Sequence, residues 1–263
     1  MAGSAPQICV VVPMHNEEGN AGALIREIAG ALAGRNFEIV AVNDASRDGT
    51  LAELQAVRSE VPSLRIVSHR KNAGQSRAVR TGVLSARAPV IATLDGDGQN
   101  PPADLPTLID ALTRADAPDG LAMVGGRRVG RQDNAGKKIA SRLGNGIRKR
   151  LLNDDADDTG CGIKAFRREA YLMLPFFDHQ HRFLPALMKR EGFLVEFRDV
   201  SHRPRIAGKS KYTNLGRLFA SISDMMGVMW LNSRARQTGG TGQRFNLGEI
   251  TVTRAAMRLD NGV

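Results

Sequence analysis

The feature that most constrains the fold is an alternation of short apolar runs with helical segments through the first third of the chain. The runs have the length of buried strands, and they are Ile8–Pro13, Phe37–Val42, Leu64–His69 and Val90–Leu94. Between them, apolar residues recur at helical spacing and predict helices over Glu17–Ala33, Thr50–Val61 and Gln75–Ala86. This alternation favours an α/β fold with a mostly parallel central sheet and helices on both faces.

The pattern becomes less regular after Pro118. A further strand is expected over Leu194–Val200, and the apolar spacing from Leu215 to Met229 predicts a C-terminal amphipathic helix. No linker separates two units. We therefore expect a single domain over residues 1–236 and a tail of unassigned structure over residues 237–263.

The chain is strongly basic, with 37 Lys and Arg against 27 Asp and Glu, a net charge of +10. Its hydrophobic content of 42% is ordinary for a globular protein and excludes a disordered chain, a collagen-like chain and a small disulfide scaffold. The positive charge indicates an anionic partner: nucleic acid, an acidic membrane surface or phosphorylated substrates. Aromatic residues, at 5%, are too sparse for a platform that stacks single-stranded nucleic acid.

Two cysteines without metal-ligand spacing, and no signal-peptide pattern over Met1–Gln7, favour a reducing, cytoplasmic compartment. The sequence also lacks the run of about 18 apolar residues that a transmembrane helix needs. The nearest candidate, Leu218–Leu231, is interrupted by Asp224. We therefore expect no membrane-spanning helix.

The sharpest motif follows the fourth expected strand and contains Asp95, Asp97 and Gln99. On a turn, both carboxylates can face one cation, with the Gln99 amide oxygen as a further ligand. Hard cations such as Mg²⁺ or Mn²⁺ take such oxygens and keep positions open for substrate phosphates. A solvated turn is the alternative for an isolated D-x-D pair. The buried strand before it and the other polar clusters favour the metal site.

Polar clusters also follow the first two expected strands. His15, Asn16 and Glu17 come after Pro13 and are suited to contacts with a nucleobase and a ribose. Helix capping by Asn16 is a compatible alternative. Asp44 follows the second strand and is suited to accept a hydrogen bond from a base or a ribose hydroxyl. Ligands of such sheets bind beyond the carboxyl ends of the strands, where these clusters fall.

These three motifs, in this order and spacing, resemble the family 2 inverting glycosyltransferases with the GT-A nucleotide-sugar fold. Four further segments are similar to the dolichol-phosphate mannose synthase branch, which includes bacterial polyprenyl-phosphate glycosyltransferases. They are Gly125–Arg127, Ser141–Arg142 with Asn145, Asp158–Arg168 and Arg205–Tyr212. The resemblance covers about Ile8 to Arg236.

The resemblance implies a role for each matching position. The residues that would bind the nucleotide sugar are Pro13, His15, Asn16, Glu17, Val42, Asp44, Asp95, Gly96, Asp97, Gln99, Arg127, Arg205 and Lys211. The residues that would bind the divalent cation, Mg²⁺ or Mn²⁺, are Asp95, Asp97 and Gln99. The residues that would hold the acceptor phosphate are Arg142, Ser210 and Lys211. The residues expected to be catalytic are Asp97, Asp158 and Arg127.

The implied activity is the inverting transfer of a hexose, mannose or glucose, from GDP or UDP to a polyprenyl phosphate of the dolichyl or undecaprenyl type. Residues 205–236 would supply an acceptor loop and an interfacial helix, which predicts a peripheral enzyme on the cytoplasmic face of the membrane. A separate membrane-protein partner is compatible with this arrangement, and nucleic acid becomes the least favoured partner.

Two alternatives remain open. One is a glycosyltransferase of the same fold with a soluble or polysaccharide acceptor, and the basic motif from Arg205 to Lys211 argues against it. The other is a non-catalytic basic module that binds membranes. The intact pair of Asp95 and Asp97 argues against that module, because membrane binding does not require a metal-ligand motif.

Overall fold

The computed structural model describes residues 4–129, 146, 148, 150–152, 154, 156, 158, 160–203 and 214–235, with side chains in the last segment from residue 222 onward. It contains a seven-stranded sheet in the order β3-β2-β1-β4-β6-β5-β7. The strands are β1 (Ile8–Met14), β2 (Phe37–Asn43), β3 (Leu64–Ser68), β4 (Val90–Thr93), β5 (Leu121–Arg128), β6 (Lys164–Arg167) and β7 (Leu194–Val200). β6 is antiparallel to both of its neighbours, and the other adjacent strands are parallel.

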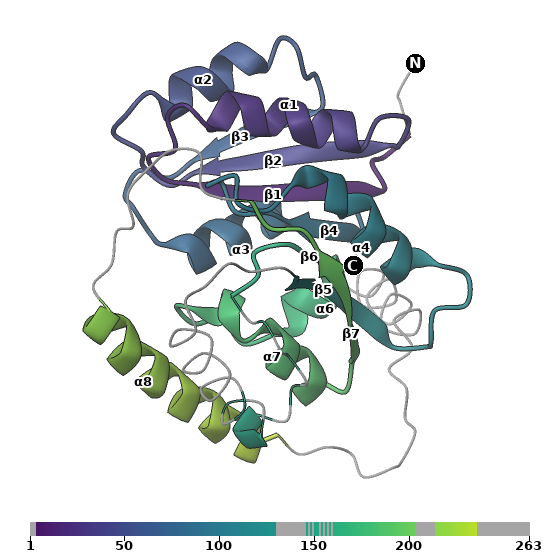
Figure 1. Ribbon diagram of the computed structural model, residues 1–263, viewed down its shortest axis with the longest axis vertical. Helices are drawn as coiled ribbons and strands as arrows, with labels where there is room; N and C mark the ends of the chain where they lie inside the picture. Colours follow the sequence, from purple (N-terminus) through teal and green to yellow (C-terminus); the bar gives the residue numbers. More distant parts are fainter. Residues whose placement is uncertain are drawn as a thin grey trace, which may run out of the picture.

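Helices cover both faces of the sheet, as expected (Figure 1). The helices are α1 (Ala21–Ala31), α2 (Thr50–Val57), α3 (Gln75–Ser85), α4 (Leu105–Thr113), α6 (Arg168–Met173), α7 (Leu184–Arg190) and α8 (Asn214–Ser233), with short 3₁₀ turns η1 (Pro102–Asp104) and η2 (Gln180–Arg182). α1 and α2 lie on one side of the first three strands and α3 on the other. The expected α/β class and the expected C-terminal helix are therefore confirmed.

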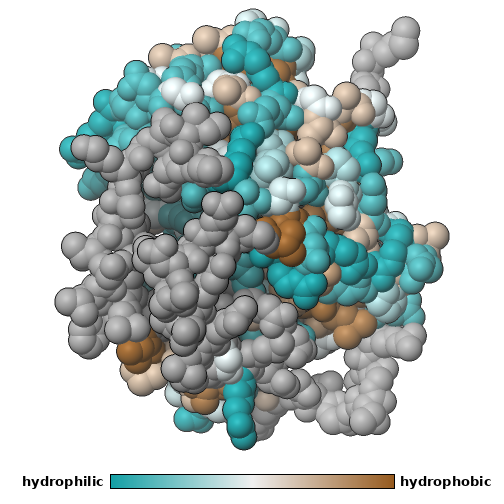
Figure 2. Space-filling model, in the orientation of Figure 1, coloured by the Kyte–Doolittle hydropathy of each residue, from teal (hydrophilic) through white to brown (hydrophobic). Residues whose placement is uncertain are grey.

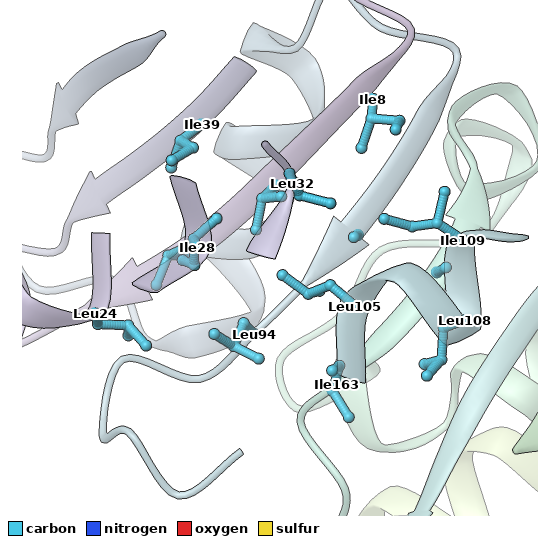
Figure 3. Packing of buried hydrophobic residues seen from close by; sticks show 14 of the residues in the cluster. Ile8, Leu24, Ile28, Leu32, Ile39, Leu94, Leu105, Leu108, Ile109 and Ile163 are labelled. Atoms are coloured by element: carbon cyan, nitrogen blue, oxygen red, sulfur yellow. The ribbon is translucent and has the colours of Figure 1, made fainter. Parts of the chain in front are cut away.

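The core consists of two hydrophobic clusters, one on each face of the sheet. Successive strand residues point to opposite faces, so Val10 belongs to the cluster under α1 and α4, whereas Cys9 belongs to the cluster under α3. Figure 3 shows the first cluster, in which Ile28 of α1 and Leu105 of α4 lie among its buried side chains. Burial of each such aliphatic side chain contributes about 1.5–3 kcal/mol. This double coverage explains why the strands are continuous apolar runs.

The start of the first helix differs from the expectation. The sequence pattern predicts a helix from Glu17, but α1 begins at Ala21 and Asn20 is its N-cap. Asn16 has a φ of 54°, in the left-handed region, so the chain turns away from the strand before the helix starts. Asn tolerates this conformation better than most residues. The turn leaves residues 15–17 at the end of β1, outside the helix.

The strand order changes direction between β1 and β4, because β2 and β3 lie on one side of β1 and the later strands lie on the other. In open α/β sheets this switch point is where the loops leaving two neighbouring strands separate and a ligand crevice forms. The loops that leave β1 and β4 carry the 15–17 cluster and the D-x-D pair. The topology thus places the two strongest sequence motifs at one location.

Candidate active site

The D-x-D turn follows β4 and is anchored from the end of β7. Asp95 and Asp97 are half-buried, and the Asp97 carboxylate accepts a hydrogen bond from the Gln99 backbone N–H at 3.1 Å. Arg203 secures the same turn: its backbone N–H donates to the Gln99 carbonyl at 3.0 Å, and its guanidinium donates to the Gly98 carbonyl. The turn therefore has a defined shape before any ligand binds. Arg203 was not predicted from the sequence.

Gly96 brings the D-x-D turn against the end of β1. A Cβ atom at this position would lie 2.9 Å from the Pro13 carbonyl oxygen and 3.1 Å from the Met14 side chain. Glu17 is next, with its Cγ at 3.4 Å. Only glycine permits this approach, so the two motifs that the sequence separates by some 80 residues form one surface.

The first and second motifs are joined by hydrogen bonds between main chain and side chains. The Asn16 N–H donates to Ser46 Oγ at 3.0 Å, and the Asn16 amide oxygen accepts from the Arg47 N–H at 2.8 Å. The Glu17 N–H donates to Thr50 Oγ1 at 2.8 Å. Asn16 is thus held in place by the loop after β2, and Glu17 by the first residue of α2.

Asp44 is the centre of the second motif, and its side chain is buried. Its carboxylate accepts four hydrogen bonds at 2.7–3.0 Å, from His69 Nδ1, Asn72 Nδ2, Ala73 N and Gly74 N. A carboxylate offers about four acceptor positions, so these donors occupy its capacity. Its backbone carbonyl accepts from His15 Nδ1 at 2.8 Å. In this arrangement Asp44 shapes the 69–74 loop, and the predicted nucleoside contact of its carboxylate requires one of these bonds to open.

Val42 is fully buried in the cluster under α3, so its side chain is directed into the core. Pro13 is half-buried, with its carbonyl at the Gly96 contact. The nucleoside contacts predicted for these two residues remain predictions. For Val42, such a contact would have to involve main-chain atoms.

Two consecutive arginines at the end of β5 have different partners. Arg128 forms a bidentate pair with Asp158, with N–O distances of 2.6 and 2.7 Å and side chains that are 14% and 12% exposed. The hydrogen bond to Asp158 raises the pKa of Arg128 above its ordinary value. Arg127 instead donates to Asp199 at 2.6 Å near the surface. The sequence prediction named Arg127 and Asp158 as catalytic, and the structure places Arg128, which was missed, against Asp158.

Residues at the start of α3 reach the D-x-D turn and the η2 segment. The Gln75 side-chain amide donates to the Asp95 carboxylate at 2.7 Å. Ser76 Oγ is 2.7 Å from His181 Nδ1 and accepts from the His181 backbone N–H at 3.2 Å. Burial lowers the pKa of His181 to about 3, with Lys164 as the next contributor, and keeps its imidazole neutral. No local pattern in the sequence predicts either contact.

The donor set of the D-x-D turn fits a divalent cation. Among the described residues, no group of three or more His, Cys, Asp and Glu side chains gathers to form a closed metal site. Mg²⁺ is commonly bound by one or two carboxylates, with phosphate oxygens and water completing its shell. Asp95 and Asp97 with Gln99 match that pattern. Of the residues predicted to bind phosphates, Arg142, Arg205, Ser210 and Lys211 lie outside the described part of the chain.

Comparison with known proteins agrees with this geometry. The model of the family described as "Glycosyl transferase family 2" matches residues 9–174, which include β1 to β4, the D-x-D turn and β6. The chain belongs to glycosyl transferase family 2. The predicted family is thereby confirmed, and the chain is a glycosyltransferase by membership.

Curated relatives of this family 2 member act on polyprenyl phosphates according to their names. It is 34% identical over 234 residues to a dodecaprenyl-phosphate galacturonate synthase of Rhizobium johnstonii, covering 85% of this chain and 67% of that one. It is also 34% identical over 209 residues to an undecaprenyl-phosphate 4-deoxy-4-formamido-L-arabinose transferase of Shewanella sediminis, covering 78% and 61%. The match thus spans about two thirds or less of these relatives' lengths.

Solved structures confirm the GT-A fold. Glucosyl-3-phosphoglycerate synthase of Mycobacterium tuberculosis, in complex with Mn²⁺, UDP and phosphoglyceric acid, superposes with a TM-score of 0.66. The superposition covers 89% of this chain and 81% of that one at 17% identity. At this identity the likeness establishes the fold alone.

Proposed function

We propose that this family 2 glycosyltransferase transfers a sugar from a nucleotide diphosphate to a polyprenyl phosphate with inversion at the anomeric carbon. The observation that carries the proposal is the contact of the D-x-D turn with the end of β1 through Gly96, because it forms one surface suited to a nucleoside and a diphosphate. The polyprenyl phosphate follows from the names of the curated relatives. The proposal therefore combines a donor site inferred from the fold with an acceptor class named for the relatives.

The chemistry requires little general-base assistance, because the acceptor phosphate is already an anion. One of its oxygens forms a bond to the anomeric carbon while the bond from that carbon to the nucleotide diphosphate breaks. The main obstacle is repulsion between two anions. Asp95, Asp97 and Gln99 would hold Mg²⁺ or Mn²⁺, which supplies Lewis-acid stabilisation of the leaving diphosphate when bound. Solved proteins of the same fold contain Mn²⁺ or Mg²⁺ with UDP.

Arginines would offset the remaining negative charge. The Arg127 guanidinium lies beside Asp199 and is about half exposed. Among the arginines proposed for a phosphate contact, it is the one that lies in the described part of the chain. Arg142, Arg205 and Lys211 are proposed for the same task from the sequence. Arg suits this role because its planar guanidinium binds phosphate oxygens in pairs. Arg128 and Asp158 would instead stabilise the wall of the site through their bidentate pair.

A donor and acceptor screen tests the proposal. Purified protein with Mn²⁺ would be offered GDP-mannose, UDP-glucose and UDP-galacturonate, each with a short polyprenyl phosphate or with 3-phosphoglycerate. We expect a glycosyl lipid product from one donor. Mannose and glucose donors are tested first, because the family resemblance of the sequence implies these sugars. Transfer only to 3-phosphoglycerate would favour a soluble acceptor, and no transfer or donor hydrolysis in any combination would contradict the enzyme assignment.

We further propose that α8 docks on the membrane surface. Its inward side carries Val228, which is fully buried, and Met225, which packs against the core. Its outward side carries Ile222, Met226 and Trp230, which are 41%, 59% and 59% exposed at helical spacing. Figure 2 shows hydrophobic surface in the lower part of the molecule, where Figure 1 places α8. No helix in the described ranges is long and apolar enough to cross a membrane.

Liposome sedimentation tests this docking. We expect the protein to sediment with anionic vesicles, and the double substitution of Met226→Ser and Trp230→Ser to weaken binding because it removes the exposed apolar side chains. Ser223→Ala, at an exposed polar position of the same helix, is the matched control. Equal sedimentation of the double variant and the control would overturn α8 as the docking element.

A further inference from the structure

The first residue of α3 connects two parts of the candidate active site that the sequence keeps apart. The Gln75 side chain extends from the N-terminus of α3 to the Asp95 carboxylate, and its Nε2 lies 2.7 Å from Oδ1. A carboxylate only accepts hydrogen bonds, so the amide nitrogen must be the group that faces it. Hydrogen bonds to a charged acceptor are roughly twice as strong as neutral ones. The contact therefore restrains the Asp95 side chain.

The backbone on both sides of Gln75 is held in place. On one side, the Asp44 carboxylate accepts from the Ala73 and Gly74 N–H groups at 2.8 Å. Gly74 has a φ of +82°, a left-handed conformation that glycine adopts without steric cost, and it is the N-cap of α3. On the other side, Ser76 is buried and pairs with His181 at 2.7 Å. The reach of the Gln75 side chain is thus set by a rigid anchor.

The opposite side of Asp95 is also restricted. A Cβ atom on Gly162 would lie 2.2 Å from Asp95 Oδ2, so the loop before β6 approaches this oxygen as closely as a glycine allows. The same loop is tied to β4, because Thr93 Oγ1 donates to the Gly162 carbonyl at 3.1 Å. Asp95 therefore lies between a hydrogen-bond donor on α3 and a close backbone wall.

We propose that Gln75 is a positioning residue that orients the Asp95 carboxylate for the divalent cation of the D-x-D turn. The inference rests on the proposed function, because it assumes that Asp95 and Asp97 bind the cation. Groups that hydrogen-bond to a ligating carboxylate fix its orientation, and their loss costs about 10–100-fold in metal affinity. Gln75 has a fixed anchor and a carboxylate partner, which are the two properties such a residue needs.

Binding of Mn²⁺ in the presence of UDP, followed through the electron paramagnetic resonance signal of free Mn²⁺, tests the assignment. A parallel series uses GDP. We expect Gln75→Leu to raise the dissociation constant of Mn²⁺ by about tenfold or more, because the leucine keeps the size of the side chain and removes the donor. Nucleotide affinity without metal and the thermal midpoint should stay at wild-type values. Gln55→Leu, at an exposed position on α2, is the matched control.

The outcomes separate this inference from the function on which it rests. Unchanged Mn²⁺ affinity in Gln75→Leu, together with lost affinity in Asp97→Ala, would overturn the role of Gln75 and keep the metal site. Equal Mn²⁺ affinity in wild type and Asp97→Ala would overturn the metal site itself. Equal losses of metal-free nucleotide affinity and of Mn²⁺ affinity in Gln75→Leu would show a general structural role, and would also overturn the positioning role.

Discussion

The two halves of the sheet hold their functional side chains by different interactions. Around the ends of β1 and β2, hydrogen bonds between main chain and side chains join neighbouring loops, as in the contacts of Asn16 with Ser46 and Arg47. Around β5 and β7, ion pairs connect neighbouring segments instead, as in the pair of Arg128 with Asp158. The first half is therefore a set of preformed loops, whereas the second half depends on long side chains that meet across the fold.

The difference has an energetic consequence. A loop held by several hydrogen bonds between main chain and side chains keeps its shape when one side chain is shortened, because the other hydrogen bonds remain. A buried charge pair behaves otherwise, since removal of one partner leaves the other with its desolvation cost. We therefore expect stability to be most sensitive in the second half and chemistry to be most sensitive in the first.

The largest expected effect is on the mostly buried pair of Arg128 and Asp158 in the second half. Arg128→Met removes the bidentate partner of Asp158 and should lower the free energy of unfolding by up to about 3–5 kcal/mol, the range for a fully buried pair. Arg127→Met, next to it in the sequence but paired with Asp199 at the surface, should cost about 0–1 kcal/mol. Urea unfolding of both variants measures the contrast. Equal costs would remove the distinction between the two arginines.

The next effect is on chemistry in the first half. Asp97→Ala should lower metal-dependent turnover by about 100-fold or more, because one preorganised contact to developing charge is worth roughly 3 kcal/mol. Its thermal midpoint should match that of the wild type, and EDTA should reduce the wild type to the same level. Initial rates with and without Mn²⁺ check this. Full wild-type activity in EDTA would contradict the metal assignment.

A smaller effect tests the contact between the two motifs. Gly96→Ala places a methyl group 2.9 Å from the Pro13 carbonyl, so the turn or the end of β1 must shift. We expect a loss of about 1–3 kcal/mol in stability and weaker nucleotide binding. Gly30→Ala on α1, where nothing lies within 4 Å, is the control and should stabilise the protein slightly. Unchanged nucleotide affinity in Gly96→Ala would show that the contact is not needed.

The last effect, which is smallest near neutral pH and grows as the pH falls, concerns the link between the halves, the pair of Ser76 and His181. Burial lowers the folded-state pKa of His181 from 6.5 to about 3, so only the unfolded chain binds a proton between these values. The free energy of unfolding should therefore fall as pH decreases below 6.5, by about 1.4 kcal/mol per pH unit from this group. His181→Gln should show a shallower decline. Urea unfolding between pH 4 and pH 7 measures it, and parallel curves would contradict the assignment.

The sequence predicts the first half of the fold well, for a physical reason. β1 to β4 and α3 nearly match their expected ranges, and β7 coincides with the expected Leu194–Val200. Strands buried on both faces must be apolar throughout, and that signal is local. β6 was missed because it has four residues, two of them Lys164 and Arg167, and it becomes a strand by pairing with β4 and β5.

The residues of the candidate site also fall into a group that the sequence predicts and a group that it misses. The D-x-D pair and the clusters after β1 and β2 are contiguous in the sequence, so their spacing suffices to find them. Gln75, Arg128 and Arg203 were missed because their partners lie 20 to 105 residues away. The apolar spacing predicts the C-terminal helix, but only the structure shows that Val228 packs on the core and Trp230 faces outward.

The sequence by itself determined the family, the alternation of strands and helices, and the polar clusters that follow the strands. Those properties depend on residues close together in the chain. The tertiary structure decided which of Arg127 and Arg128 meets Asp158, which donor restrains Asp95, and how Asp44 uses its carboxylate. Strand residues alternate between faces, but only the packing and register of neighbouring elements determine what each face contacts.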